Sequence, residues 1–267
     1  MRSLSQLFRA LIRPGNANQD PGSPALLQKA MDAVMAPYRD GNYQAALLAA
    51  EGLRPGGGKP APYCFFRGTM LMHLGHYMEA EKWLRESISR EKEPQQTAIG
   101  YSTLGQLLIH QQRYEESLQC FATSLRHWPD RGSTHRDMAE ALLHRGHLSK
   151  AFQCAKMAID KDSAAGALPP GAYGLNMSAN LATLAWAVAA SSREKEEVDR
   201  LVKEAMPLVA DTQVRSITAQ VHYHSARAYS ELGDAGRSGH HYKEAARIDP
   251  GGLWGRAARA MSSGVAP

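Results

Sequence analysis

One local pattern recurs four times in this sequence of 267 residues. A small or polar residue is followed two positions later by an aromatic or apolar residue, and five positions later by a small one. The four copies begin at Gly41, Gly75, Gln112 and Gly146. The first two copies start 34 residues apart, as do the last two, and the middle pair starts 37 residues apart. A fixed period in this range predicts a solenoid of stacked helical hairpins.

Apolar residues follow a helical period from Pro24 onward, in segments that pair around short turns. Glycine and proline end several of these segments, since proline cannot continue the hydrogen-bond ladder of a helix. The predicted helix pairs cover residues 25–39 with 43–53, 62–74 with 77–90, 97–110 with 114–126, 133–143 with 148–160, 175–191 with 194–210, and 217–232 with 237–248. A last helix is predicted over residues 253–261, where it would cap the exposed hydrophobic end of the solenoid.

These segments divide the solenoid into two blocks. A regular block of four hairpins covers residues 25–160, a degenerate block of two hairpins covers 175–250, and the capping helix and tail cover 251–267. The turns near Gly146 and Ser192 lie 46 residues apart, which exceeds the period and predicts an insertion over residues 161–174. We interpret this insertion either as a hinge between the blocks or as a loop, tipped by Leu168 and Tyr173, that overhangs a groove or binds a partner.

Residues 1–13 form a separate amphipathic segment, and residues 14–24 have the composition of a flexible linker. The apolar residues of the segment share one face of a predicted helix: Leu4, Leu7, Phe8, Leu11 and Ile12. Gln6 and Arg9 interrupt the apolar run that a secretory signal requires. The segment is interpreted either as a short helix docked on the solenoid or as an anchor that makes weak contact with a membrane surface or a partner.

The third unit shows the fullest set of packing positions: Tyr101, Leu104, Gly105, Leu108, Tyr114, Ser117, Phe121, Ser124 and Pro129. Together with the Gly-x-Tyr turns of other units, this set resembles the tetratricopeptide repeat (TPR) over roughly Pro24 to Pro250. The resemblance implies an all-α fold, a right-handed α-solenoid of about six TPR helical hairpins with a C-terminal capping helix. In such hairpins, small residues such as Ala80 and Ala151 allow the second helix to cross the first closely.

Catalysis, metal binding and nucleic-acid binding find no support in the motifs. The sequence contains no GxxxxGK[ST], GxGxxG after a strand, GxSxG or HExxH motif, so no enzyme activity and no cofactor are predicted. The formal charge of +5 comes from basic residues scattered among acidic ones, which does not indicate a nucleic-acid partner. His222 and His224 are two positions apart and point to different sides of a helix, so they do not form a metal-ligand pair.

The three cysteines lie in predicted helices without CxxC spacing, which is typical of buried thiols in a reducing compartment. A cytoplasmic location is therefore expected, at a membrane periphery if residues 1–13 anchor the chain. The sequence gives no indication of the oligomeric state.

In TPR solenoids the first helix of each unit lines a concave groove, so the resemblance implies that the outward positions of these helices bind a partner. The predicted groove residues are Thr69, Met72, His73, Ser102, Gln106, Ile109, Arg136, Glu140, Leu143, Trp186, Tyr223 and Arg227. Aromatic and arginine side chains often dominate binding energy at such surfaces, although Trp186 and Tyr223 are equally compatible with a place in the core between units.

A clamp for a C-terminal carboxylate, as in chaperone-binding TPR domains, is not expected. The matching positions hold Phe65, Thr69, Thr103 and Asp137, with Arg136 as a lone cation.

The sequence thus favours a non-catalytic scaffold or adaptor that binds a peptide or helical segment of a protein partner in the concave groove. The alternative is a membrane-peripheral assembly factor anchored by residues 1–13, and a third hypothesis is a subunit of a hydrolase or transferase.

Overall fold

The computed structural model describes residues 24–54, 60–164, 170–210 and 214–263. The predicted helix over residues 1–13 and nearly all of the linker over 14–24 lie outside these ranges. Six helical hairpins follow one another: α2 (Pro24–Arg39) with α3 (Tyr43–Ala49) and the 3-10 helix η1 (Ala50–Leu53), α4 (Ala61–Leu74) with α5 (Tyr77–Arg90), α6 (Pro94–His110) with α7 (Tyr114–His127), α8 (Gly132–His144) with α9 (Leu148–Ala164), α10 (Pro170–Ser191) with α11 (Lys195–Ala210), and α12 (Arg215–Glu231) with α13 (Ala235–Ile248). The single helix α14 (Leu253–Ser262) follows the sixth hairpin. No strand occurs within the described ranges, and the predicted all-α solenoid is confirmed.

The recurring sequence pattern marks the turn inside each hairpin. Gly75, with φ +86°, ends α4 in the left-handed conformation that glycine adopts at little cost. Its N–H bonds to the carbonyl of Met72 at 3.0 Å, and the N–H of His76 bonds to that of Leu71 at 2.9 Å. The equivalent positions in the other hairpins also have positive φ: Gly41, Gln112, Gly146, Arg193 and Gly233. The period in the sequence therefore reflects the recurrence of a left-handed residue at the turn of each hairpin.

Small residues allow the two helices of a hairpin to pack closely. Ala80 and Ala151 are both fully buried. Gly105 on α6 lies against the ring of Phe121 on α7, and a Cβ atom at this glycine would be only 2.4 Å from the phenyl Cε1. The α6–α7 crossing thus requires glycine at this position.

The predicted insertion over residues 161–174 is shorter than expected. Helix α9 continues to Ala164 and α10 begins at Pro170, a residue well suited to the first turn of a helix. The two predicted blocks also share one hydrophobic core, in which Leu142 of α8 packs in the same cluster as Trp186 of α10 and Val221 of α12. A hinge that separates the blocks is therefore not consistent with the packing of the described helices.

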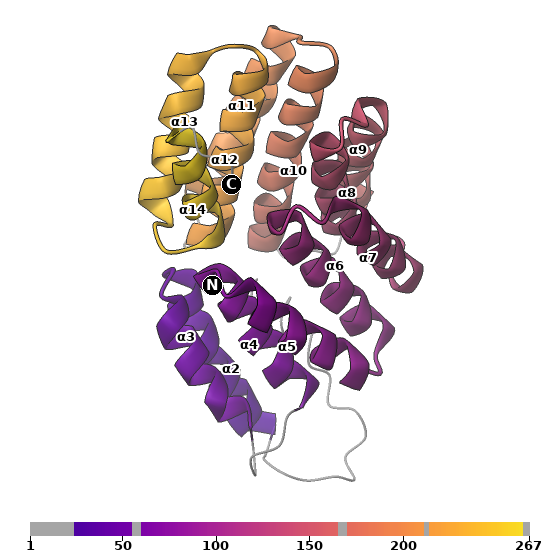
Figure 1. Ribbon diagram of the computed structural model, residues 1–267, viewed down its shortest axis with the longest axis vertical. Coiled ribbons are helices and arrows are strands. Elements are labelled where there is room, and N and C mark those ends of the chain that lie inside the picture. Colours follow the sequence, from indigo (N-terminus) through magenta and orange to yellow (C-terminus); the bar gives the residue numbers. More distant parts are fainter. Residues whose placement is uncertain (1–23, 55–59, 165–169, 211–213, 264–267) are drawn as a thin grey trace.

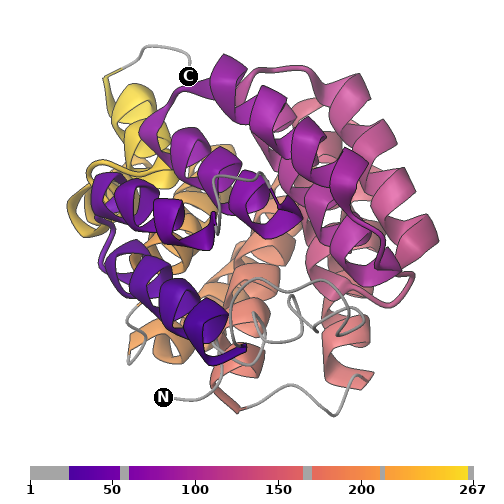
Figure 2. The same ribbon diagram turned by 90° about the horizontal axis from the view of Figure 1, so that it is seen from below.

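The solenoid curls until its two ends meet. Helices α12, α13 and α14 come round to lie beside α2, α3 and α4, from the opposite end of the sequence (Figures 1 and 2). A single hydrophobic cluster contains Leu71 of α4, Leu107 of α6, Tyr223 of α12 and Trp254 of α14. The fold is thus a nearly closed ring of helices, in which the inner faces of distant hairpins contact one another.

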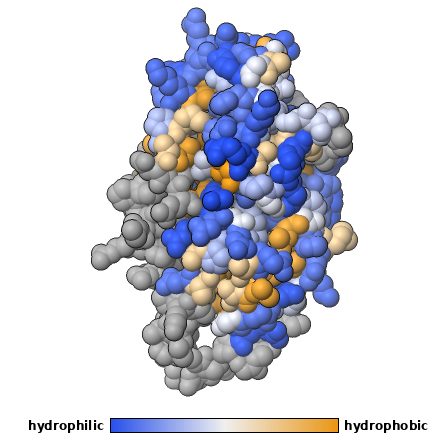
Figure 3. All heavy atoms as spheres, turned by 90° about the vertical axis from the view of Figure 1, so that its left-hand side faces the viewer, coloured by the Kyte–Doolittle hydropathy of each residue, from blue (hydrophilic) through white to orange (hydrophobic). Residues whose placement is uncertain are grey.

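The outer surface is mainly polar where Figure 3 shows it, on the side that carries α2, α3, α13 and α14. Hydrophobic residues there form small patches separated by hydrophilic ones (Figure 3). Scattered patches of this size are normal for a protein surface and do not by themselves indicate a binding site. The inner face of the ring is therefore the better candidate for a functional surface.

Replacing Gly105 with alanine is expected to lower the free energy of unfolding by about 1–3 kcal/mol, because the added methyl group overlaps the Phe121 ring. Gly239→Ala is the matched control: Gly239 is also inside a helix, α13, but no atom lies within 4 Å of an added Cβ. There, alanine is expected to stabilise the protein by up to about 1 kcal/mol. Urea denaturation measures both changes, and equal effects would contradict the packing argument.

Candidate functional site

The concave face is formed by the first helices of the hairpins, which contact one another in sequence order from α4 to α12. Nine of the twelve predicted groove residues, all on these first helices, have side chains that are buried: Met72, His73, Ser102, Ile109, Arg136, Glu140, Leu143, Trp186 and Tyr223. Thr69, Gln106 and Arg227 are half-buried. Trp186 and Tyr223, at 1% and 3% exposure, belong to the core, as the alternative interpretation of these two residues predicted. Other parts of the same chain cover most of the face.

Helix α14 provides part of this cover. The guanidinium of Arg256 donates to the carbonyl oxygens of Met72, at 3.3 Å, and His73, in the last turn of α4. The last carbonyls of a helix lack partners within the helix and carry partial negative charge, so a cation stabilises them. Gly75 makes room for this contact, because a Cβ atom there would be 3.2 Å from Arg256 Nη2. Arg256 therefore caps a helix that lies about 180 residues earlier in the chain.

Trp254 of α14 fills the centre of the covered region. Its ring lies 5.0 Å from that of His110 on α6, 5.4 Å from Tyr223 and 5.2 Å from His224, both on α12. The indole is 5% exposed. The ends of α4 and α6 therefore already contact an amphipathic helix, α14, which presents a tryptophan and an arginine to them.

A buried acid–imidazole pair lies next to this tryptophan. Glu140 Oε2 on α8 is 3.4 Å from His224 Nε2 on α12, an ion-pair distance somewhat longer than a good hydrogen bond. The other ring nitrogen of His224 is 2.9 Å from the hydroxyl of Thr183, which itself donates to the carbonyl of Ala179 at 2.8 Å. A hydroxyl has one proton, so His224 Nδ1–H is the donor to Thr183 and Nε2 faces the carboxylate. Burial alone would raise the pKa of the Glu140 carboxyl, but the imidazoles of His224, His144 and His110 lower it to about 2.

Two further histidines line the same interior. Burial lowers the pKa of His110 and of His144 to about 4 each, against an opposing effect of Glu140. The His144 ring stacks on Tyr114 at 5.1 Å and meets the edge of Trp186 at 5.3 Å. Both imidazoles are therefore neutral near pH 7 and pack as aromatic side chains.

Arg136 is not the lone cation that the sequence predicted. It is 7% exposed, and its Nη2 donates to Oδ1 of the adjacent Asp137 at 2.8 Å. Asp137 Oδ2 also accepts hydrogen bonds from Ser102, at 3.2 Å, and from Gln106 Nε2, at 3.0 Å. Three predicted groove residues thus form a buried network around one carboxylate, and the charge of Arg136 is neutralised within it.

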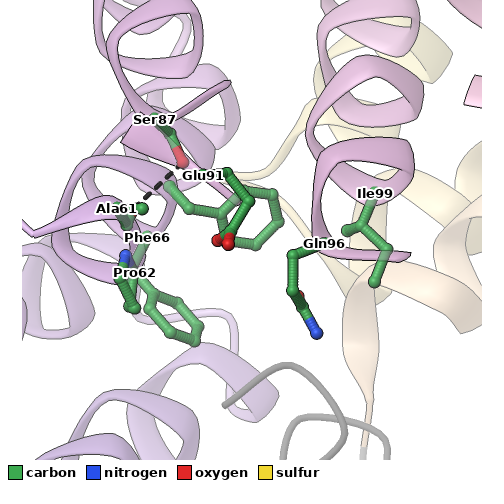
Figure 4. A pocket seen from close by; sticks show the side chains of 8 residues that line it. Ala61, Pro62, Phe66, Ser87, Glu91, Gln96 and Ile99 are labelled. Atoms are coloured by element: carbon green, nitrogen blue, oxygen red, sulfur yellow. Dashed lines mark hydrogen bonds between the residues drawn. The ribbon is translucent and has the colours of Figure 1, made fainter. Parts of the chain in front are cut away.

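A cleft remains at the opposite end of α4 and α6, where these helices begin (Figure 4). It is a shallow cleft, with about 310 Å³ of space between the side chains when the open solvent is counted, and it is lined by Ala61, Pro62, Phe65, Phe66, Ser87, Glu91, Gln96 and Ile99. The Ser87 hydroxyl donates to the Ala61 carbonyl at 2.9 Å and joins α5 to the start of α4 at this site. The Glu91 carboxylate lies between the α4 side chains and Gln96 (Figure 4). We refer to these eight residues as the α4–α6 cleft.

The α4–α6 cleft was not predicted from the sequence. Phe65 stood out there only as a residue that replaces a charged clamp position. The available signal was the pair Phe65-Phe66 in a helix expected to line the groove, which places at least one large apolar side chain near the concave face.

No group of three or more His, Cys, Asp and Glu side chains is placed to hold a metal ion among the described residues. One contact between histidines was not predicted from the sequence: Nδ1 of His222 on α12 lies 2.9 Å from Nδ1 of His241 on α13. No helix in the described ranges is both long enough and apolar enough to cross a membrane.

Substituting His224 with alanine is expected to destabilise the protein by about 3–5 kcal/mol, because the Glu140 carboxylate would stay buried without its partner. The double substitution with Glu140→Ala should cost less than the sum of the two single ones. His240→Ala, at an exposed position, is the control, with an expected change within about 0.5 kcal/mol. Denaturation of the four variants measures the coupling, and strictly additive effects would show that the pair does not interact.

Stability is expected to fall as the pH drops from 6.5 toward 4. The unfolded chain takes up protons at His110 and His144 in this range, whereas the folded protein does not until the pH reaches about 4. Each pKa unit corresponds to about 1.4 kcal/mol. Denaturation curves at pH 7, 6 and 5 should show a smaller loss of stability for His110→Gln/His144→Gln than for the wild type.

The exposed His76 provides the control for this pH experiment. The His76→Gln variant should keep the wild-type pH dependence. If the double variant also keeps it, buried histidines at these positions do not explain the effect.

Comparison with known proteins identifies two parts of the chain. Residues 96–163 and 219–251 each match a family model described as tetratricopeptide repeat. No curated protein matches the chain in a sequence search.

Solved structures show the same fold at low sequence identity. PilF of Pseudomonas aeruginosa is 13% identical, with a TM-score of 0.54 over 89% of this chain and 98% of that protein. A putative kinesin light chain of Podosopora anserina is 14% identical, with a TM-score of 0.51 over 73% and 99% of the two chains. MamA of Desulfovibrio magneticus RS-1 is also 14% identical, with a TM-score of 0.48 over 72% and 100%. The matched repeats and the hairpin solenoid together identify the chain as a tetratricopeptide repeat protein.

Proposed function

We propose that this protein is a non-catalytic scaffold that holds a helical or extended segment of a protein partner on its concave face. The α4–α6 cleft is the observation that carries this proposal, because it lies between the inward-facing helices and is not filled by α14. We propose the cleft as the place where a partner first inserts an apolar side chain.

The lining of the cleft suggests the chemistry of that partner segment. Phe65 and Ile99 are half-buried, so they present apolar surface that a partner could cover. Glu91 supplies a carboxylate beside this surface, although its Oε1 already accepts bonds from the N–H groups of Lys92 and Glu93. An apolar side chain followed by a lysine or arginine would suit both features.

A role at a membrane surface remains the sequence-based alternative, and it depends on residues 1–13, which lie outside the described ranges. The geometry of the described helices supports the scaffold.

Substituting Ile99 with aspartate is expected to remove partner binding, since it places a second carboxylate in the cleft beside Glu91. Affinity capture followed by mass spectrometry compares the proteins recovered with wild type and variant, and specific partners should fall at least about tenfold. Ile159→Asp on α9 is the matched control, because Ile159 is half-buried but does not line the cleft.

Both variants must first show the circular dichroism spectrum of the folded wild type. Recovery of the same proteins in the same amounts by Ile99→Asp would contradict the proposed site. Loss of partners from both variants would show that the effect is not specific to the cleft.

A further inference from the structure

Helix α14 is amphipathic, and its buried face has the residue pattern of a helix that binds to the surface it covers. Leu253, Trp254, Ala257 and Ala258 are buried, whereas Arg259 on the same helix is exposed. The buried residues recur at the spacing of one helix face, with two large side chains in the first turn and two small ones in the next. Trp254 contacts His110 of α6 and also Tyr223 and His224 of α12. All four buried residues share one hydrophobic cluster with Leu71 of α4 and Leu107 of α6.

The contacts of α14 fall into two sets. One set joins it to its neighbours in the chain, α12 and α13. The other set joins it to α4 and α6, through Arg256 on the carbonyls of Met72 and His73 and through Trp254 on His110. Met72, one of the residues predicted to bind a partner, is buried in the same hydrophobic cluster as Leu253, Trp254, Ala257 and Ala258 of α14. The ring of His73 stacks instead on Tyr43 of α3, and Ile109 packs against Phe121 and Ala141.

The position of α14 in the chain suits an element that can leave. It is the last described helix and has ten residues, and a helix of this length is marginal in water without tertiary contacts. Gly251 and Gly252 precede it, and an added Cβ at Gly251 would meet nothing within 4 Å. Release of α14 requires the loss of its own contacts and a change of backbone direction at the glycine pair, which also opens the corner in which Gly252 packs against Asp249. The helices of the six hairpins can keep their internal packing.

We propose that α14 is an intramolecular occupant of the concave face, and that a partner binds there by replacing it with an amphipathic helix of the same pattern. Such a helix carries a tryptophan or similar large aromatic residue, an arginine two positions later that caps α4, and small residues on the same face in the following turn. This inference rests on the proposed scaffold function and names both the class of partner and the element that controls access to it.

A synthetic peptide with the sequence of residues 251–263, labelled with a fluorophore, serves as the probe. Two charge-reversed full-length proteins are compared, Arg256→Glu and Arg259→Glu, which alter the same helix by the same charge. Only Arg256 touches α4, whereas Arg259 donates to the carbonyl of Pro250 at 2.6 Å. Fluorescence anisotropy should show at least about tenfold tighter peptide binding to Arg256→Glu than to Arg259→Glu, because the glutamate weakens the competing contact in cis.

Equal affinity of the two variants for the peptide would overturn the proposal. Since Arg256→Glu could also disturb folding, hydrogen exchange on the wild-type chain gives an independent measurement. Excess unlabelled peptide should accelerate exchange of the α14 amides, and binding without that acceleration would overturn the proposal as well.

The two proposals can fail separately. If the concave face binds no partner in the cell, the Ile99→Asp capture experiment fails while the peptide still displaces α14. If α14 is a fixed cap, the peptide experiments fail while capture still depends on Ile99.

Discussion

One buried hydrogen bond joins the first hairpin to the last: the hydroxyl of Tyr43 donates to Oδ2 of Asp249 at 2.8 Å. Asp249 is 1% exposed, and its burial raises the pKa of the carboxyl. Oδ1 of the same carboxyl is buried without a hydrogen-bond partner, and the tight corner after α13 is held by the N–H of Gly252, which donates to the backbone carbonyl of Asp249 at 3.1 Å. The corner depends on Gly252, since a Cβ atom there would lie 1.9 Å from Asp249 Oδ2. The closed ring therefore depends on a polar contact that only a few residue types could make.

Closure has a consequence for every polar group on the concave face. A residue that would meet water in an open solenoid is desolvated here, and a buried charge without a partner is costly. The charges on this face are accordingly paired: Glu140 with His224, Arg136 with Asp137, and Arg227 over the ring of Trp186 at 4.3 Å. Such pairs add little net stability compared with apolar packing, but they fit one arrangement of helices and not others. We infer that they help to fix which helices meet across the ring.

Much of the fold could be predicted from the sequence, because the helix boundaries depend on local chemistry. Gly75 ends one helix by its left-handed conformation, and the predicted and observed first residue of the next helix is Tyr77. The burial of the predicted groove residues could not be predicted in the same way. The curvature of a solenoid is the sum of small rotations between neighbouring units, and no single unit encodes whether the sum closes a ring. The burial of Met72 by contacts from α14 depends on all the intervening hairpins.

Individual contacts between side chains could not be predicted from the sequence either. Neighbouring helix residues such as Arg136 and Asp137 do not normally face each other, so the pair that neutralises Arg136 had no signal in their spacing. The α4–α6 cleft needs the start of α4, the end of α5 and the start of α6 in contact, a juxtaposition created only by the stacking of two units. Phe65 was visible in the sequence, but its neighbours in space were not.

The two parts of the concave face lie far enough apart to set the length of a partner that uses both. Ile99 lines the cleft and His110 contacts Trp254, and the two lie eleven positions apart on α6, a distance of about 16 Å. A partner segment would need roughly eleven residues to span this distance as a helix, or about five as an extended strand. The cleft lies outside the contacts of α14, whereas the ends of α4 and α6 would become available only on the proposed release of α14. An apolar side chain held first in the cleft would keep the rest of the segment close to α14, and this high effective concentration would favour the exchange of one helix for the other.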